Sequence, residues 1–85
     1  MKRGILVYDH SIEEWRLWIG HTRYWIQQGY SFEVKIDQYY FTAFLEKDND
    51  WLVTLNGDVV FTLHEHEIYK VRVQKEDYIP VDAPF

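Results

Sequence analysis

Alternation of apolar and polar residues with a period of two dominates the chain from Phe32 onward. Successive side chains of a strand point to opposite faces, so each alternating stretch predicts a strand with one buried face. Five such stretches follow one another, at residues 32–37, 41–45, 51–55, 59–63 and 69–73. Residues 4–8 are apolar on both faces, which predicts a further strand in a central or closed position.

Turn residues separate these stretches. Asn56-Gly57 is the dipeptide preferred in a tight type I′ hairpin turn, because both central residues of that turn need positive φ. Residues 47–50 and the pair Asp37-Gln38 have turn composition as well. Turns this short predict a meander of antiparallel neighbours.

Residues 11–28 fit two structures. As strands, Trp15, Leu17 and Ile19 alternate correctly before a turn at Gly20-His21. As a helix, Ser11 and Glu14 would form a capping box. We expect strands, because Gly20 would weaken the centre of a helix and the aromatic and β-branched residues favour sheets. The alternative is an α+β fold, with a helix in 11–28 packed on a five-stranded meander.

The expected fold is therefore all-β: a small, SH3-like, strongly bent antiparallel barrel of six to eight short strands. Residues 1–77 would form this single domain. Residues 78–85 contain both prolines of the chain, Pro80 and Pro84, and would form a tail that packs on the surface or serves in docking.

Composition agrees with a folded domain in a reducing compartment. Hydrophobic residues make up 47% and aromatic residues 19% of the 85 residues, enough to close a small core. The chain has no Cys, whereas small secreted domains usually depend on disulfides, so we expect a cytoplasmic protein. No apolar stretch has the length of a signal peptide or of a membrane span, so we expect no membrane partner.

The formal net charge is −5, and residues 46–67 contain six acids against the single basic Lys47. This balance disfavours a nucleic-acid partner, which needs clustered Lys and Arg. It suits a protein partner with a basic surface.

Catalytic groups are scarce. The chain offers no thiol, only Ser11 and Ser31 as serines, and four isolated glycines that cannot form a phosphate-binding loop. We therefore expect no enzyme, no catalytic residue and no cofactor. His64 and His66 would share one face of a strand, but a stable metal site needs three or four ligands and no third histidine is near in sequence, so we expect no metal site.

Aromatic residues divide between the two faces of the predicted strands. Those expected in the core are Trp15, Phe32, Phe41, Trp51 and Phe61. Those expected on the outer face are Trp18, Trp25, Tyr30, Tyr40 and Phe44. An exposed aromatic cluster often marks a partner surface. The predicted partner-binding residues are Trp18, Trp25, Tyr40, Phe44, Glu46, Asp48 and Asp50.

Five segments resemble a family of small proteins of unknown function. They are residues 1–9 (MKRGILVYD), 29–34 (GYSFEV), 41–46 (FTAFLE), 50–53 (DWLV) and 71–73 (VRV). The family they resemble is found in Gram-positive bacteria, plasmids and phages and is thought to be SH3-like. The resemblance implies a mobile-element setting but no particular chemistry.

Our leading expectation is a non-catalytic protein-interaction module of a bacterium or its mobile elements, binding through exposed aromatics and an acidic edge. It would be a monomer or a weak homodimer. One alternative is a phage-type inhibitor that blocks a host defence or DNA-handling protein by acidic mimicry. Another is a small barrel that binds single-stranded nucleic acid, using Arg16, Arg23 and Lys35 near the outer aromatics.

Overall fold

The computed structural model describes residues 1–74 and 78–81, and within them the chain is all-β. The eight strands are β1 (Lys2–Asp9), β2 (Glu14–Ile19), β3 (Thr22–Trp25), β4 (Ser31–Ile36), β5 (Tyr39–Lys47), β6 (Trp51–Leu55), β7 (Val59–Thr62) and β8 (Tyr69–Val73). The expected all-β fold is confirmed. The alternative helix in 11–28 is wrong, because these residues form β2 and β3 around the turn at Gly20.

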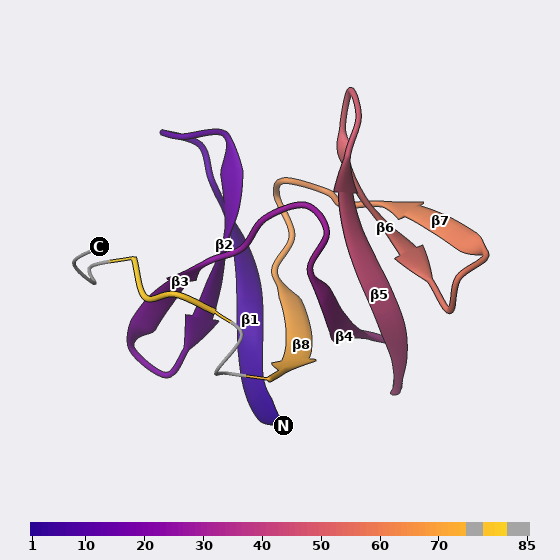
Figure 1. Cartoon of the computed structure of the whole chain (residues 1–85), viewed down its shortest axis with the longest axis horizontal. Coiled ribbons are helices and arrows are strands. Elements are labelled where there is room, and N and C mark those ends of the chain that lie inside the picture. Colours follow the sequence, from indigo (N-terminus) through magenta and orange to yellow (C-terminus); the bar gives the residue numbers. More distant parts are fainter. Residues whose placement is uncertain (75–77, 82–85) are drawn as a thin grey trace.

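One antiparallel sheet contains all eight strands, in the order β3-β2-β1-β8-β4-β5-β6-β7. The last strand, β8, lies between β1 and β4 and thereby joins the two halves of the sheet (Figure 1). Only two residue pairs connect β8 to β4, whereas six connect β4 to β5. The sheet bends strongly around this junction, so that the inner faces of both halves enclose one core.

The core consists of the inward-facing side chains that the alternation predicted. Trp15 is fully buried and Phe32 is 3% exposed, while Phe41, Trp51 and Phe61 are partly buried against the same cluster. Trp51 also donates its indole N–H to the Glu13 carbonyl oxygen at 3.3 Å. This bond ties β6 to the β1–β2 turn, at one end of the bent sheet.

The hairpin turns follow the sequence signals. Asn56 and Gly57 have φ of 51° and 83°, and the Asp58 N–H donates to the Leu55 carbonyl at 3.1 Å, as a type I′ turn requires. Gly20 has φ of 61° in the β2–β3 turn, a conformation that suits glycine.

The C-terminal segment covers the outer edge of β3. The Trp25 N–H donates to the Ile79 carbonyl and the Val81 N–H to the Arg23 carbonyl, both at 2.9 Å. Pro80, which has no N–H, lies between the two bonded residues. Tyr78 is only 5% exposed and packs in the core, whereas Ile79 is 45% exposed and Pro80 and Val81 are partly buried; residues 82–85 lie outside the described residues. None of the described residues forms a helix long and apolar enough to cross a membrane.

Candidate nucleic-acid interface

The outer face of the sheet, opposite the core, has a row of basic and aromatic side chains across six strands. Strand pairing places Arg23 beside Trp18, Trp18 beside Ile5, and Ile5 beside Lys70. Lys35 pairs with Tyr40, and extending the β4–β8 register by one residue beyond Val34–Val71 sets Lys35 beside Lys70. We call these residues the basic-aromatic row: Arg23, Trp18, Ile5, Lys70, Lys35 and Tyr40.

The centre of this row is a hollow of about 450 Å³. Trp18 and Tyr40 both line it, and its charged lining residues are Arg3, Lys35 and Lys70. No acid is among the described residues that line the hollow. Within residues 1–74 and 78–81, these three bases form no ion pair. The hollow is therefore a positively charged depression with aromatic rings in its wall.

Arginines stack on the aromatic rings of this face. The Arg72 guanidinium carbon lies 3.8 Å from the Tyr40 ring centroid, and its Nη2 lies 2.6 Å from Glu33 Oε1. On β3, the Arg23 guanidinium lies 5.8 Å from the Trp18 ring centroid. Cation–π stacking of this kind restricts the orientation of the rings, which favours a preformed surface.

Arg16 lies beside the row and is only 6% exposed. Its guanidinium carbon is 4.1 Å from the Trp25 ring centroid, and its Nε is 3.9 Å from Asp9 Oδ2. The pKa of Asp9 is lowered, chiefly by the hydrogen bond from the Ser11 hydroxyl and then by that from the Ser11 backbone, with a smaller contribution from Arg16. Trp25 and Arg16 thus serve each other as packing partners at the margin of the row.

The predicted partner-binding residues fall into two groups. Trp18 and Tyr40 lie in the row, with Trp25 beside it. Phe44, Glu46 and Asp48 instead line a separate hollow with Leu52 and Val60. Asp50 lies in the β5–β6 turn, near that second group. The outward placement of Tyr30 is wrong, because its ring packs edge-on against Tyr78 at 4.9 Å and contacts the core.

Comparison with known proteins identifies a family for this chain. Residues 4–73 match the family model described as Domain of unknown function (DUF5348). The chain belongs to the DUF5348 family. No curated protein matches the chain. No solved structure matches it either.

Sequence reasoning missed three basic residues on this face of the DUF5348 domain: Arg3, Lys70 and Arg72. The alternation in β8 places Lys70 and Arg72 opposite the core, and that signal is visible in the sequence. What the sequence does not reveal is the strand order, which inserts β8 between β1 and β4. This insertion brings Lys70 next to Lys35 and Arg72 next to Arg3 and Glu33.

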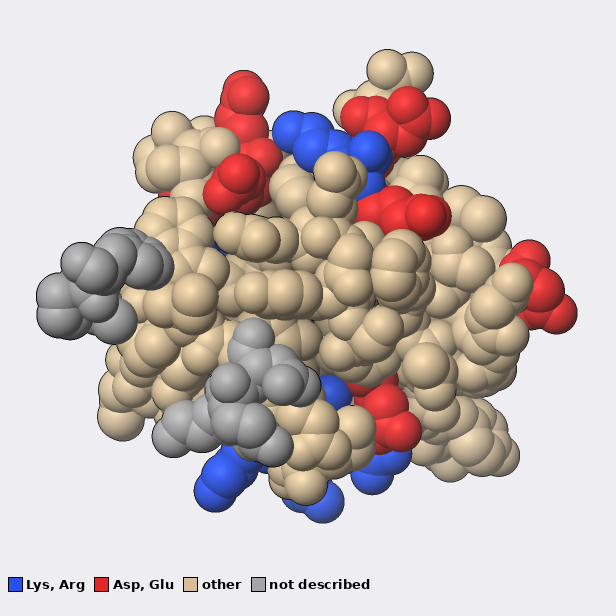
Figure 2. Space-filling view, in the orientation of Figure 1, with Lys and Arg blue, Asp and Glu red and all other residues tan. Residues whose placement is uncertain are grey.

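Acidic residues of the DUF5348 domain do not form one continuous edge. Asp48 and Asp50 lie at one end of β6, and Asp58 lies in the turn at its other end. Glu65 and Glu67 lie in the β7–β8 connection. Figure 2 shows acids gathered along the upper edge and the right-hand side, whereas Lys and Arg gather along the lower edge, with one basic group among the upper acids and one acidic group among the lower bases.

His64 and His66 lie in the connection after β7, not on a strand, so the same-face geometry expected for a strand does not apply. The His66 ring centroid is instead 5.9 Å from that of His10. Across the described part of the chain, no three His, Cys, Asp or Glu side chains come together as a metal site would need.

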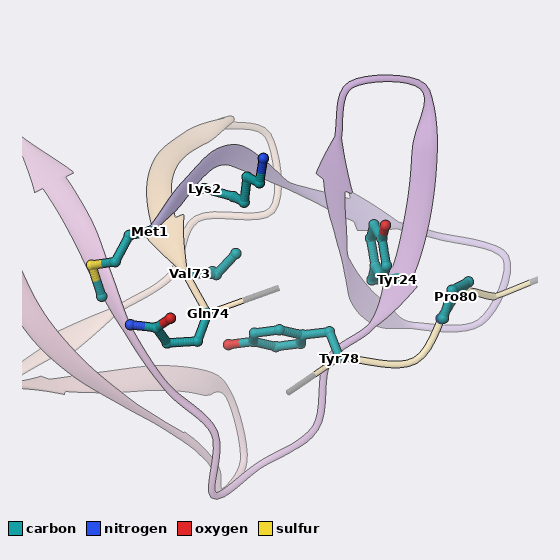
Figure 3. Close-up of a pocket in the computed structure, with 7 residues that line it drawn as sticks. All are labelled: Met1, Lys2, Tyr24, Val73, Gln74, Tyr78 and Pro80. Carbon is teal, nitrogen blue, oxygen red and sulfur yellow. The ribbon is translucent and has the colours of Figure 1, made fainter. Parts of the chain in front are cut away.

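A further hollow of about 650 Å³ lies under the C-terminal segment of the DUF5348 domain. Figure 3 shows the Tyr78 ring extending from that segment toward Gln74, with Met1 and Lys2 nearby. The lining also includes Tyr24, Val73 and Pro80, and the described lining contains no carboxylate or imidazole. Among the described residues, its one charged lining residue is Lys2, whereas three bases line the hollow in the row.

Proposed function

We propose that this domain is a non-catalytic module that binds single-stranded nucleic acid along the basic-aromatic row. The observation that supports this proposal is the hollow itself, in which three bases, with no acidic partner among the described residues, lie between Trp18 and Tyr40. Lys and Arg neutralise backbone phosphates, and nucleobases stack on aromatic side chains. The row supplies both kinds of group on one face.

The net charge of −5 is the strongest argument against nucleic acid, and it was the reason to expect a protein partner. Distance weakens that argument, because the Debye length is about 8 Å at physiological ionic strength. The acids at the β5–β6 and β6–β7 turns are three or more strands from β1. A strand bound near Ile5 therefore interacts mainly with Arg3, Lys35 and Lys70.

The proposal also includes the biological setting and the cellular location of the protein. The resemblance to proteins of bacteria, plasmids and phages supports a mobile-element setting, in which single-stranded intermediates are common substrates for binding proteins. The absence of cysteine supports a cytoplasmic location. An SH3-like architecture is a further proposal, supported by the small bent sheet.

The test is fluorescence anisotropy with a labelled oligothymidine of about ten nucleotides at low salt. We expect saturable binding that Trp18→Ala weakens about tenfold, since stacking contributes roughly 1–3 kcal/mol per base. Tyr40→Ala should weaken binding similarly. Tyr39→Ala is the matched control, because Tyr39 is 69% exposed but alternates to the other face of β5.

Salt dependence provides a second readout of the same titration. Three neutralised phosphates predict a slope of log K against log salt of about −2, from roughly −0.7 per phosphate of a single strand. Lys70→Gln should reduce that slope, whereas Lys47→Gln, on the acidic hairpin, should not. Absence of binding at low salt, or equal losses in the Tyr39 and Tyr40 variants, would contradict the proposal.

A further inference from the structure

The two edges of the sheet differ in their protection. Residues 79–81 cover the outer edge of β3, but within the described residues nothing pairs with the outer edge of β7. The residues of β7 are uncharged, and Val59 and Val60 are 55% and 63% exposed. Proteins usually protect a free edge with charges, proline or a bulge. An uncharged, exposed edge strand suggests that another strand covers it.

The backbone of β7 is suitably oriented for such pairing. The Leu63 N–H donates to the Trp51 carbonyl at 3.0 Å, so hydrogen-bonded pairs with β6 recur at Phe61 and Val59. The residues between them, Val60 and Thr62, therefore direct their N–H and C=O groups away from β6. Two donors and two acceptors are thus presented at the free edge.

We propose that this edge pairs antiparallel with β7 of a second copy of the chain, forming a two-fold symmetric dimer. A symmetric register sets Val60 opposite Thr62 of the second copy, and Phe61 opposite its own counterpart. Both residues of each Val60–Thr62 pair have outward backbone groups, so four hydrogen bonds form across the axis. The two sheets become one continuous sheet.

The charges next to the edge are compatible with a second copy as the occupant. Like charges are kept apart in this register. On the outer face, strand pairing sets Glu46 beside Leu52 and Leu52 beside Thr62. In the dimer, this line of neighbours across the strands continues through Val60, Thr54 and Phe44 of the second copy. No acid faces an acid along it.

The exposed apolar residues next to the edge agree with this arrangement. Phe44 is 43% exposed and lines one hollow with Leu52 and Val60 on the outer face. Pairing of the β7 strands would bury Val60 and bring the two apolar patches together across the axis. A contact of this kind explains why β7 has no charged residue, because a charge there would be desolvated between the copies.

Sedimentation equilibrium of the full chain tests the dimer, with the protein itself as the probe. We expect the mass to rise from 10.4 kDa toward twice that value with concentration. Val60→Lys and Thr62→Lys should remain monomeric at concentrations where the wild type is dimeric. The matched control is Ile68→Lys, the same kind of change at a residue that is 61% exposed but not on the edge, which should dimerise normally.

Circular dichroism confirms that each variant folds, and two edge variants are included so that misfolding of one leaves a test. A wild-type protein that is monomeric up to millimolar concentration would overturn the proposal. So would folded edge variants that dimerise like the wild type. Trp18→Ala should dimerise normally, so a failed dimer and a failed nucleic-acid site are distinguishable.

Discussion

Gly4 is the position where β1 and β2 leave no room for a side chain. A Cβ at this position would lie 2.6 Å from the Trp18 carbonyl oxygen and 3.2 Å from Ile19 Cγ1. The obstructing atom belongs to the backbone of a paired strand, so it cannot move without disturbing the ladder. Because Trp18 and Ile5 are in the basic-aromatic row, Gly4 fixes the spacing beneath that row.

Gly4→Ala should therefore lower the free energy of unfolding by about 1–3 kcal/mol, the usual cost of overpacking. Urea denaturation measures this difference. Gly20→Asn is the control, since the space around Gly20 is open and Asn tolerates its positive φ. If Gly4→Ala were as stable as the wild type, the close approach of β1 and β2 would be wrong.

Asp9 makes the stability of the fold depend on pH. Its carboxylate accepts the Ser11 hydroxyl at 2.6 Å and the Ser11 N–H at 3.0 Å, which lowers the pKa of Asp9 below its ordinary value. A carboxyl whose folded pKa is lowered stabilises the fold above its unfolded pKa, and this contribution is lost as pH falls through the folded pKa.

Asp9→Asn should thus lower the melting temperature at pH 7, and the difference from wild type should shrink as pH falls toward about 2. Thermal unfolding followed by circular dichroism at a series of pH values measures it. Asp37→Asn, at an exposed turn, controls for general loss of a carboxylate. A difference that persists unchanged at acidic pH would rule out the Ser11 hydrogen bonds as its cause.

At the scale of elements, alternation and turn chemistry predicted most of the sheet. The period of two located the strands from β4 to β8, and Asn56-Gly57 located the β6–β7 turn, because both signals are local. Strand order is not a local property. Nothing in residues 69–73 alone indicates that β8 pairs with both β1 and β4, so the basic residues that meet in the hollow could not be grouped from sequence.

The C-terminal segment illustrates the same limit. Two prolines indicated a tail outside the ladder, but the backbone groups on either side of Pro80 still bond to β3. Tyr78 is anchored in the core, where its ring packs against Tyr30 and its hydroxyl donates to the Ser31 carbonyl at 3.4 Å. The contact depends on residues 47 positions apart in sequence.

Tyr78→Ala should accordingly destabilise the protein by about 3 kcal/mol, as expected for removal of a buried aromatic ring. Ile79→Ala, at a residue that is 45% exposed, should cost much less. Urea denaturation monitored by tryptophan fluorescence compares the two. Equal small effects would mean that the segment merely lies on the surface.

At the scale of the whole molecule, charge is segregated although its sum is negative. Acids gather at the β5–β6 hairpin and the neighbouring turns, while Arg3, Lys35 and Lys70 meet on the outer face near the junction of the two halves. A total charge of −5 therefore does not describe the local charge of this face. Local charge and aromatic content determine the ligand class that we propose.

Chemical-shift mapping by NMR tests that claim most directly. Oligothymidine of about ten nucleotides is added to ¹⁵N-labelled protein at low salt. We predict the largest shifts at the Trp18 indole and at the amides of Ile5, Lys35, Tyr40 and Lys70, with little change in β6 and β7. Shifts concentrated around Phe44 and Asp48, or no shifts at all, would contradict it.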